Sequence, residues 1–245
     1  MIRTNAIMRD NTLFSLNGKQ AQVTGASGRI GLALARSLER HGAKIVLNAR
    51  HPETLVATRA MLAAEGVDAT CAPFDVTDQD GVIASVEKVA RTRGPIDILI
   101  NNAGIQRRAP LDPFTRTDRD VVIATNLNAV FFVGRAVARH MLPRGRGKIV
   151  NICSVPSELA RPGIAPYTAT KGAVRTLTRG MATDRARHGL QVNGLTAGYF
   201  RTEMTEKLVA DTEFTGWLCQ RMPGGAGVMW RNWWALPYSC HQTHQ

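Results

Sequence analysis

Short apolar runs alternate with amphipathic stretches at a regular pitch along most of this chain. The runs are rich in Val, Ile and Leu, which is typical of strands buried on both faces of a parallel sheet. The stretches between them repeat apolar residues at helical spacing. No linker or internal repeat divides the pattern, so the sequence predicts a single α/β domain with a doubly wound parallel sheet.

The expected elements can be placed by residue number. Strands are expected at residues 20–24, 44–48, 68–72, 96–101, 148–153 and 191–196. Helices are expected at residues 30–41, 52–65 and 78–93, as a pair within 116–141, and at 167–188. Residues 1–13 then form an N-terminal extension, residues 14–223 the domain, and residues 224–245 a tail of different composition.

Composition and cysteine content set the broad class of protein. A chain of 245 residues that is 44% hydrophobic can bury a substantial core. The apolar runs are much shorter than the ~20 residues needed to cross a bilayer, and the N-terminus lacks the apolar core of a signal peptide. Four cysteines without CxxC spacing fit free thiols in a reducing compartment. We therefore expect a soluble cytoplasmic protein with no membrane partner.

The formal charge of +12 would suit a nucleic-acid-binding protein. The basic residues are scattered over the predicted helices, however, with no dense run and no interleaved aromatic residues. A small substrate or cofactor that carries phosphate or carboxylate explains the sign of the charge equally well. We expect such a small-molecule partner, and neither nucleic acid nor a metal ion.

A glycine-rich segment, TGASGRIG, follows the first predicted strand at residues 24–31. Glycines let the backbone turn sharply and approach a pyrophosphate, which then rests on the positive N-terminal end of the next helix. Such a turn alone is a weak signal, but its place between a strand and a helix strengthens it. The residues expected to bind a dinucleotide here are Gly25, Ser27, Arg29, Ile30 and Gly31.

The end of the second predicted strand bears on the choice between NAD and NADP. A carboxylate there would bind the ribose 2′-hydroxyl of NAD, whereas an arginine can accept the 2′-phosphate of NADP. This chain has no acid there and offers Arg50, so the sequence favours NADP, with NAD and a solvated role for Arg50 left open. Asp75 follows the third predicted strand, where it can meet the adenine edge, cap its own turn, or do both.

Two further segments suit the same cleft. The fourth predicted strand runs into NNAG, and small residues there would let Asn102, Ala103 and Gly104 lie against the cofactor. Asn126 is a polar residue in an otherwise apolar helical stretch, and a buried amide needs hydrogen-bond partners. One such partner would be a water molecule that leads to Lys171.

The chemistry is predicted to come from Tyr167, Lys171 and Ser154. Tyr167 and Lys171 are four residues apart in a helical pattern, which puts both on one helix face. An ammonium beside a phenol lowers the phenol pKa from about 10, which makes Tyr167 a candidate general acid and base. Ser154 follows a buried strand and could hold the oxygen that Tyr167 protonates. Taken alone, this tyrosine and lysine could equally be a solvated surface pair.

Taken in order, TGASGRIG, NNAG, Asn126, Ser154 and YTATK resemble the short-chain dehydrogenase/reductase family over roughly residues 14–223. The resemblance implies a Rossmann-type fold and hydride transfer between nicotinamide C4 and a carbinol carbon. It implies that Ser154 orients the substrate oxygen and that Tyr167 exchanges its proton. Lys171 would lower the tyrosine pKa and hold the nicotinamide ribose, and Asn126 would complete a proton relay.

Within the family, the chain is most similar to members that interconvert D-gluconate and 5-keto-D-gluconate. The similar segments are FSLNGK, IDILINNAGIQRRAPL, KIVNICSVPSELARPGIAPYTATKGAVR and HGLQVNGL. A sugar acid needs a cation for its carboxylate. Arg108, just past NNAG, is the first choice and Arg161 the second, although either can be an ordinary surface arginine. A reductase for another polyol or oxoacyl substrate is an alternative.

Three residues depart from the family pattern. Arg29 stands where the glycine loop usually has glycine, and its side chain would either crowd the pyrophosphate or place a charge beside it. Gln22 stands in mid-strand where an aliphatic residue is expected, and a buried amide without partners costs about 1–3 kcal/mol. Ala197 occupies the usual position of a proline.

The tail after Pro223 departs most. Where the family continues with a helix and a final strand, this chain reads GGAGVMWRNWWALPYSCHQTHQ. A suitable choice of codons for residues 224–245, read from the third base of the first codon, gives GRWGDVEELVGAAVFLSSDAS. That segment resembles the missing part of the family along its whole length. We therefore infer a one-base deletion near the codon after Pro223, so that the final helix and strand are missing or replaced.

Such a frameshift would affect stability and assembly. Loss of the buried side chains would weaken the fold and uncover a sheet edge. It puts in doubt the homo-oligomer that the family often forms, and a non-catalytic relic becomes the alternative to an enzyme. Sequencing the coding DNA across Pro223 tests the hypothesis, which fails if no other reading frame encodes the family segment.

Overall fold

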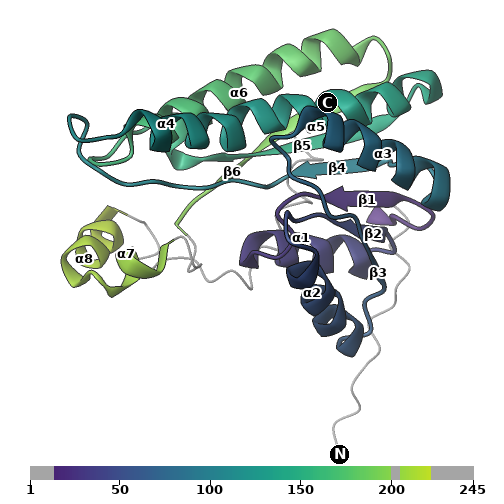
Figure 1. Cartoon of the computed structure of the whole chain (residues 1–245), viewed down its shortest axis with the longest axis horizontal. Helices are drawn as coiled ribbons and strands as arrows, with labels where there is room; N and C mark the ends of the chain where they lie inside the picture. The colour runs from purple at the N-terminus through teal and green to yellow at the C-terminus, as the bar shows by residue number, and fades with distance from the viewer. Residues whose placement is uncertain (1–13, 200–204, 222–245) are drawn as a thin grey trace, which may run out of the picture.

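Six parallel strands form the centre of the molecule, in the order β3-β2-β1-β4-β5-β6 (Figure 1). The computed structural model describes residues 14–199 and 205–221, so the predicted N-terminal extension and the altered tail lie outside the described residues. The chain runs outward from β1 to β3, returns to the middle at β4 and runs outward again to β6. The predicted doubly wound sheet in a single α/β domain is therefore confirmed.

All the predicted strands are present, to within two residues at each end. They are β1 (Gln20–Val23), β2 (Lys44–Leu47), β3 (Ala69–Cys71), β4 (Ile98–Asn101), β5 (Gly147–Ser154) and β6 (Leu190–Ala197). The register of β5 and β6 places Ser154 opposite Ala197 at the carboxyl ends of the two strands.

The predicted helices are present as well. They are α1 (Arg29–Arg40), α2 (Pro52–Ala64), α3 (Gln79–Arg93), α4 (Arg116–Ile123), α5 (Ala129–Met141) and α6 (Ala165–Ala186). Two short helices that the sequence did not predict, α7 (Glu206–Ala210) and α8 (Thr212–Arg221), lie apart from the layers, beyond the ends to which the strand arrows point (Figure 1).

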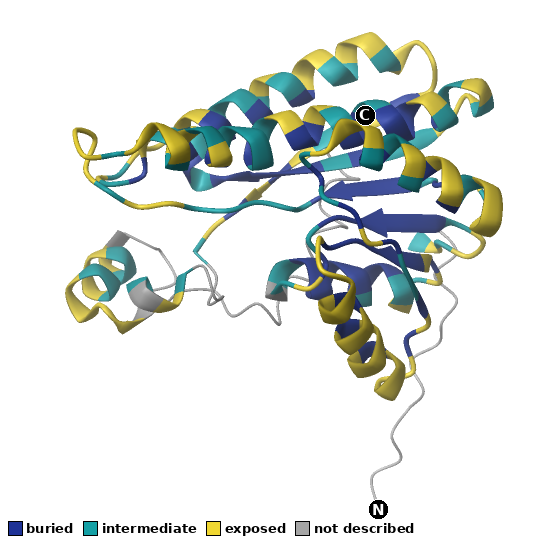
Figure 2. Cartoon of the chain, viewed as in Figure 1, coloured by how far each residue is buried: buried dark blue, intermediate teal, exposed yellow. Residues whose placement is uncertain are grey.

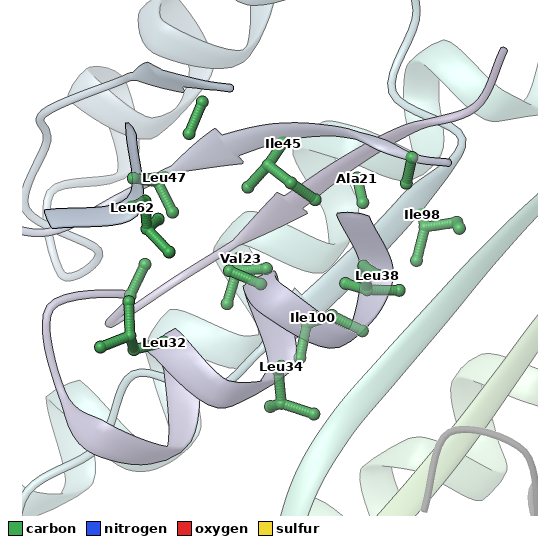
Figure 3. Close-up of a cluster of buried hydrophobic side chains, with 14 of the residues drawn as sticks. Ala21, Val23, Leu32, Leu34, Leu38, Ile45, Leu47, Leu62, Ile98 and Ile100 are labelled. Carbon is green, nitrogen blue, oxygen red and sulfur yellow. The ribbon is translucent and has the colours of Figure 1, made fainter. Parts of the chain in front are cut away.

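Alternate strand residues supply two cores on opposite faces of the sheet. On one face, Val23 and Ile45 pack with side chains of α1 and α2 (Figure 3). On the other face, Val46 and Leu99 pack with side chains of α3 and α5. Figure 2 shows the result: the central strands β1 and β4 are buried along their whole length, and the helices are exposed on their outer sides. Burial on both faces explains why the strands read as continuous apolar runs.

α4 and α5 form one nearly continuous helix, interrupted by a π-helical turn at Ala124–Asn128. Within the described residues, the span Arg116–Arg144 is the one helix long and apolar enough to cross a membrane. Half of its most apolar window is buried inside the molecule, as in the core helix of a layered domain. The span is therefore weak evidence for a membrane segment.

The two halves of the sheet diverge between β1 and β4. In open α/β sheets, ligands bind at the carboxyl ends of the strands beside such a switch point. The loops that follow β1, β4, β5 and β6 therefore define where a site is to be sought.

Gln22 is a polar residue in the apolar interior. It lies in the middle of β1, between Val46 of β2 and Leu99 of β4, and it is fully buried. Neither atom of its amide has a hydrogen-bond partner among the described residues. An orphaned buried amide costs about 1–3 kcal/mol, so we predict that Gln22→Leu raises the free energy of unfolding by about that amount. Urea denaturation measures the change.

Gln20, at the start of the same strand, provides the matched control. Its Nε2 donates a hydrogen bond to the carbonyl oxygen of Gly94 at 2.8 Å. Gln20→Leu removes a satisfied hydrogen bond and should not stabilise the protein. If both variants were stabilised equally, the gain would come from general hydrophobicity, and the argument from the orphaned amide would be wrong.

Candidate active site

A cleft of about 340 Å³ opens at the carboxyl ends of β1, β4, β5 and β6. The glycine-rich loop and the NNAG segment line one part of it, and residues that follow β5 and β6 line the rest. The predicted site residues that line the cleft are Gly25, Ser27, Ile30, Gly31, Asn102, Ala103, Gly104, Arg108, Ser154, Arg161, Tyr167 and Lys171. Most of the residues singled out in the sequence are thus brought together.

Two glycines of the first loop lie where no side chain would fit. Gly25 has a φ of 61°, and a Cβ there would lie 2.8 Å from Ala103 Cα. A Cβ at Gly31 would collide with the carbonyl oxygen of Gly25. Because both positions lack a side chain, the loop can turn tightly and lie directly against the NNAG segment, as expected of a turn that binds the pyrophosphate of a dinucleotide.

α1 begins directly after this loop. Gly28 is its N-cap residue and makes no side-chain capping bond, so the first N–H groups of the helix are open to an anion. The helix dipole favours negative charge at the same place. Arg29 contributes its backbone to this turn, but its side chain lies outside what the structure describes. The predicted effect of that side chain on a pyrophosphate stays a prediction.

A set of hydrogen bonds fixes the glycine-rich loop against the NNAG segment. Asn102 Nδ2 donates to the carbonyl oxygens of Thr24 and Gly25 at 2.9 and 3.0 Å. Thr24 Oγ1 accepts from the backbone N–H groups of Asn102 and Ala103 at 3.0 and 3.1 Å. Thr24 had no predicted role, although a polar residue at the end of a buried strand could have indicated one. The two loops act as one rigid wall.

Arg50 and Asp75 follow β2 and β3, outside the lining of the cleft. Arg50 Nη1 lies 3.9 Å from Asp75 Oδ2, and the arginine side chain is 67% exposed. Asp75 Oδ1 accepts from the N–H and the hydroxyl of Thr77 at 2.8 and 2.7 Å, which is the turn-capping role. Burial alone would raise the pKa of Asp75, but the Thr77 hydrogen bonds and nearby Arg50 lower it overall. Arg50 is thus an exposed cation after β2, and its contact with an NADP 2′-phosphate stays a prediction.

Ser154, Tyr167 and Lys171 converge at the end of β5, and all three are buried. Lys171 Nζ donates to the carbonyl oxygen of Ile152 at 2.6 Å and lies 5.8 Å from the centre of the Tyr167 ring. The Ser154 hydroxyl is close enough to the Tyr167 phenol to lower the pKa of that phenol. Burial excludes the reading of Tyr167 and Lys171 as a solvated surface pair, and the geometry suits proton exchange with a ligand oxygen.

Burial shifts the pKa values of Tyr167 and Lys171 in opposite directions. Burial raises the pKa of Tyr167, and the nearby Ser154 hydroxyl and the charge of Arg161 offset only part of that rise. Burial lowers the pKa of Lys171 to about 8. Burial outweighs the neighbouring charges at Tyr167, and the prediction that Lys171 makes Tyr167 more acidic stays a prediction. Desolvation dominates, and Tyr167 is a protonated acid at neutral pH.

Asn126 lies in the π-helical turn and is fully buried. Its Oδ1 accepts from the Ile105 N–H at 2.8 Å, and its Nδ2 donates to the Ile105 carbonyl at 2.9 Å and to Thr170 Oγ1 at 3.4 Å. The amide therefore connects the loop after β4 to α6, one residue before Lys171. A proton relay through water stays a prediction.

Arg108, in the loop after β4, and Arg161, in the connection between β5 and α6, both line the cleft. Arg108 Nε donates to Gln106 Oε1 at 2.9 Å. Burial and the charge of Arg161 lower the pKa of Arg108, while Tyr199 opposes that shift. Two cations thus face one cavity, which makes it a favourable place for an anionic group.

Sequence reasoning missed several residues that complete this part of the cleft. Gln106 follows the NNAG segment, Tyr199 follows β6, Thr205 caps the start of α7 and Leu208 lies within α7. Tyr199 could have been found, because residues just past the carboxyl end of a parallel strand face the same edge as the other site residues. Thr205 and Leu208 had no comparable signal, since α7 is too short to show a periodic pattern.

Comparisons with known proteins agree with this geometry. The short chain dehydrogenase family profile matches residues 19–213. Gluconate 5-dehydrogenase of Gluconobacter oxydans (strain 621H) is 68% identical over 213 residues, which cover 87% of this chain and 83% of the relative. 5-keto-D-gluconate 5-reductase of Escherichia coli (strain K12) is 50% identical over 218 residues, covering 87% and 84%.

A solved structure gives the same result. The crystal structure of a gluconate 5-dehydrogenase from Burkholderia cenocepacia J2315 in complex with NADP and tartrate matches with a TM-score of 0.86 at 52% identity. The match covers 89% of this chain and 86% of that one. The predicted similarity to gluconate-converting members of the family is therefore confirmed.

Burial of Lys171 predicts a pH-dependent stability. Its pKa is lowered from 10.5 to about 8 by folding, so the unfolded state binds more protons between these values. Folding therefore favours the neutral amine. Its contribution to the free energy of unfolding is fully present above the pKa of Lys171 in the unfolded chain, and it is lost as the pH falls toward 8. Relative to Lys171→Met, the free energy of unfolding of the wild type should rise by on the order of 3 kcal/mol from pH 8 to 10.5. Denaturant unfolding at a series of pH values measures it.

Lys88, an exposed lysine of α3, serves as the control. Lys88→Met should leave the pH dependence of the unfolding free energy close to that of the wild type. Parallel profiles for the wild type and Lys171→Met across this range would contradict the prediction.

Proposed function

The chain belongs to the short-chain dehydrogenase/reductase family, and on that premise we propose that it interconverts D-gluconate and 5-keto-D-gluconate with NADP(H). The cleft carries this proposal, because an acid, Tyr167, and two cations, Arg108 and Arg161, face the same cavity. A sugar acid offers a carbonyl or carbinol group to Tyr167 and a carboxylate to Arg108 and Arg161. The relatives named gluconate 5-dehydrogenase and 5-keto-D-gluconate 5-reductase support the same pair of compounds.

The residues around the cleft fit a dinucleotide. Gly25 and Gly31 allow the tight turn between β1 and α1 that a pyrophosphate site needs, and the N-terminus of α1 adds N–H donors. Arg50 would accept the 2′-phosphate, so NADP is proposed over NAD. When bound, NADP(H) supplies or accepts the hydride. The NADP in the Burkholderia cenocepacia relative supports this choice.

Tyr167 is proposed to exchange the proton. Burial raises its pKa, so at neutral pH the phenol carries the proton that a ketone oxygen needs on reduction. Ser154, which lines the same cleft as the phenol, would orient that oxygen. Oxidation in the reverse direction requires the phenolate and is therefore expected to be favoured at more alkaline pH. Lys171, held by the Ile152 carbonyl, would hold the nicotinamide ribose.

Arg108 is the proposed first partner of the substrate carboxylate, with Arg161 as the second. Gln106 holds Arg108 Nε, which fixes the direction of the guanidinium. An anion between the two arginines would offset the repulsion by which Arg161 lowers the pKa of Arg108. Tartrate, the small hydroxy acid present with the Burkholderia cenocepacia relative, is of the same chemical class.

The proposed setting is the cytoplasm, with a small sugar acid as the partner. The few cysteines support this compartment; of those in the described residues, Cys71, Cys153 and Cys219 are free thiols. The family's homo-oligomer stays doubtful for this chain, since the inferred frameshift would alter its last elements.

Direct measurement of NADPH oxidation tests the proposal. Purified protein mixed with NADPH and 5-keto-D-gluconate should oxidise NADPH, and NADH should support a lower rate. Tyr167→Phe should lower kcat by about 10²–10⁴-fold because the proton donor is removed. NADPH fluorescence titration and thermal melting should show that this variant still folds and still binds the cofactor.

Other outcomes identify the rival functions. Reduction of another polyol-derived or oxoacyl ketone, without turnover of 5-keto-D-gluconate, would contradict the proposed substrate and retain the family chemistry. A folded, soluble protein that reduces none of these ketones would favour the non-catalytic relic.

A further inference from the structure

We propose that Phe214 of α8 is a positioning residue that orients Arg161 toward the cleft, so that the substrate carboxylate meets a guanidinium already in place. The inference rests on the proposed function, because it concerns the carboxylate end of that substrate. Phe214 does not line the cleft itself and belongs to none of the motifs described above. Its role would be exerted through Arg161.

Phe214 is the middle ring of an aromatic stack beside the cleft. Its ring centre lies 5.7 Å from that of Tyr199, at an interplanar angle of 61°, and 5.6 Å from that of Trp217, at 27°. The guanidinium carbon of Arg161 lies 5.5 Å from the centre of the Phe214 ring. That distance is within the ~6 Å over which cation–π attraction acts. Two rings therefore set the orientation of the ring that Arg161 contacts.

The contact with Phe214 matters because the surroundings of Arg161 would otherwise favour turning its side chain away from the cleft. No carboxylate among the described residues forms an ion pair with Arg161, and the nearby charge that repels it is that of Arg108, a second cation. Repulsion between the two would favour conformations in which the long Arg161 side chain turns away from the cleft. An aromatic ring attracts a guanidinium without neutralising it, so Arg161 keeps its charge for an anionic ligand.

The start of α8 places Phe214. Asp211 Oδ1 accepts from the Phe214 N–H at 2.9 Å, and Asp211 O accepts from the Thr215 N–H at 2.9 Å, as at a helix N-terminus. On the other side of Asp211, α7 contributes Leu208 to the cleft lining. One segment therefore closes part of the cleft and, through Phe214, orients a cation within it.

Two substitutions separate a role of the π face from plain apolar packing. Phe214→Leu keeps an apolar side chain and removes the ring, whereas Phe214→Tyr keeps the ring. For Phe214→Leu we expect a roughly five- to thirtyfold rise in KM for 5-keto-D-gluconate, the range that such a cation–π contact supports, with kcat and the KM for NADPH little changed. Phe214→Tyr should stay close to the wild type. Calorimetric titration of D-gluconate into the NADPH-bound protein should show the same loss of affinity for Phe214→Leu.

Arg161→Gln provides the second test. If Phe214 acts through Arg161, then Phe214→Leu should cause no further loss in the Arg161→Gln background. Additive losses would overturn the inference in favour of plain packing. So would an equal rise in KM for an uncharged ketone of the same length, or a wild-type KM for 5-keto-D-gluconate in Phe214→Leu.

Failure of this inference and failure of the proposed function give different results. If the wild-type protein does not reduce 5-keto-D-gluconate, the proposed function fails and this inference fails with it. If the wild type does reduce it and Phe214→Leu leaves its KM and the calorimetric affinity unchanged, only the role of Phe214 is wrong.

Discussion

The active-site geometry depends on one buried hydrogen bond, from Lys171 Nζ in α6 to the carbonyl oxygen of Ile152 in β5, at 2.6 Å. A buried amine is costly unless its donors are satisfied, and this carbonyl lies two residues before Ser154 on the same strand. Because Lys171 is one helical turn after Tyr167, the bond also fixes the phenol relative to Ser154. A single contact between helix and strand therefore sets the relation of all three groups, and the burial it requires raises the pKa of Tyr167 and lowers that of Lys171.

The opposite wall of the cleft depends on the lack of side chains. Gly25 and Ala103 come from loops that follow β1 and β4, and they lie so close together that a methyl group at Gly25 would not fit. Asn102 joins the same two loops through hydrogen bonds to Thr24 and Gly25. One side of the cleft is thus formed by closely packed backbone and the other by buried polar groups. Because β1, β4 and β5 are adjacent strands, the spacing of the strands sets the distance between these two sides.

The sheet could be predicted because strands buried on both faces keep continuous apolar runs, and the site motifs could be predicted because parallel strands bring their carboxyl ends to one edge. The ionisation of Tyr167 could not be predicted from the sequence. Its desolvation depends on Val122 and Ile164, which other elements bring against the ring. α8 was missed because it contacts the rest of the domain through aromatic pairs such as Phe214 with Tyr199, not through a regular apolar stripe against the sheet. The sequence flagged Gln22 as unusual, but only its neighbours in space show that its amide has no partner among the described residues.

The arginines link substrate charge to proton chemistry. The charge of Arg161 acts on two groups, since it lowers the pKa of Arg108 and also opposes the burial that raises the pKa of Tyr167. A carboxylate paired with Arg161 would screen that charge, and the phenol would then hold its proton more strongly. Binding of a sugar acid would thus favour the protonated form of Tyr167, which is the form that reduces a ketone. The position of Arg161 therefore matters both for binding and for the acid, and Phe214, which contacts its guanidinium, lies at the junction of the two effects.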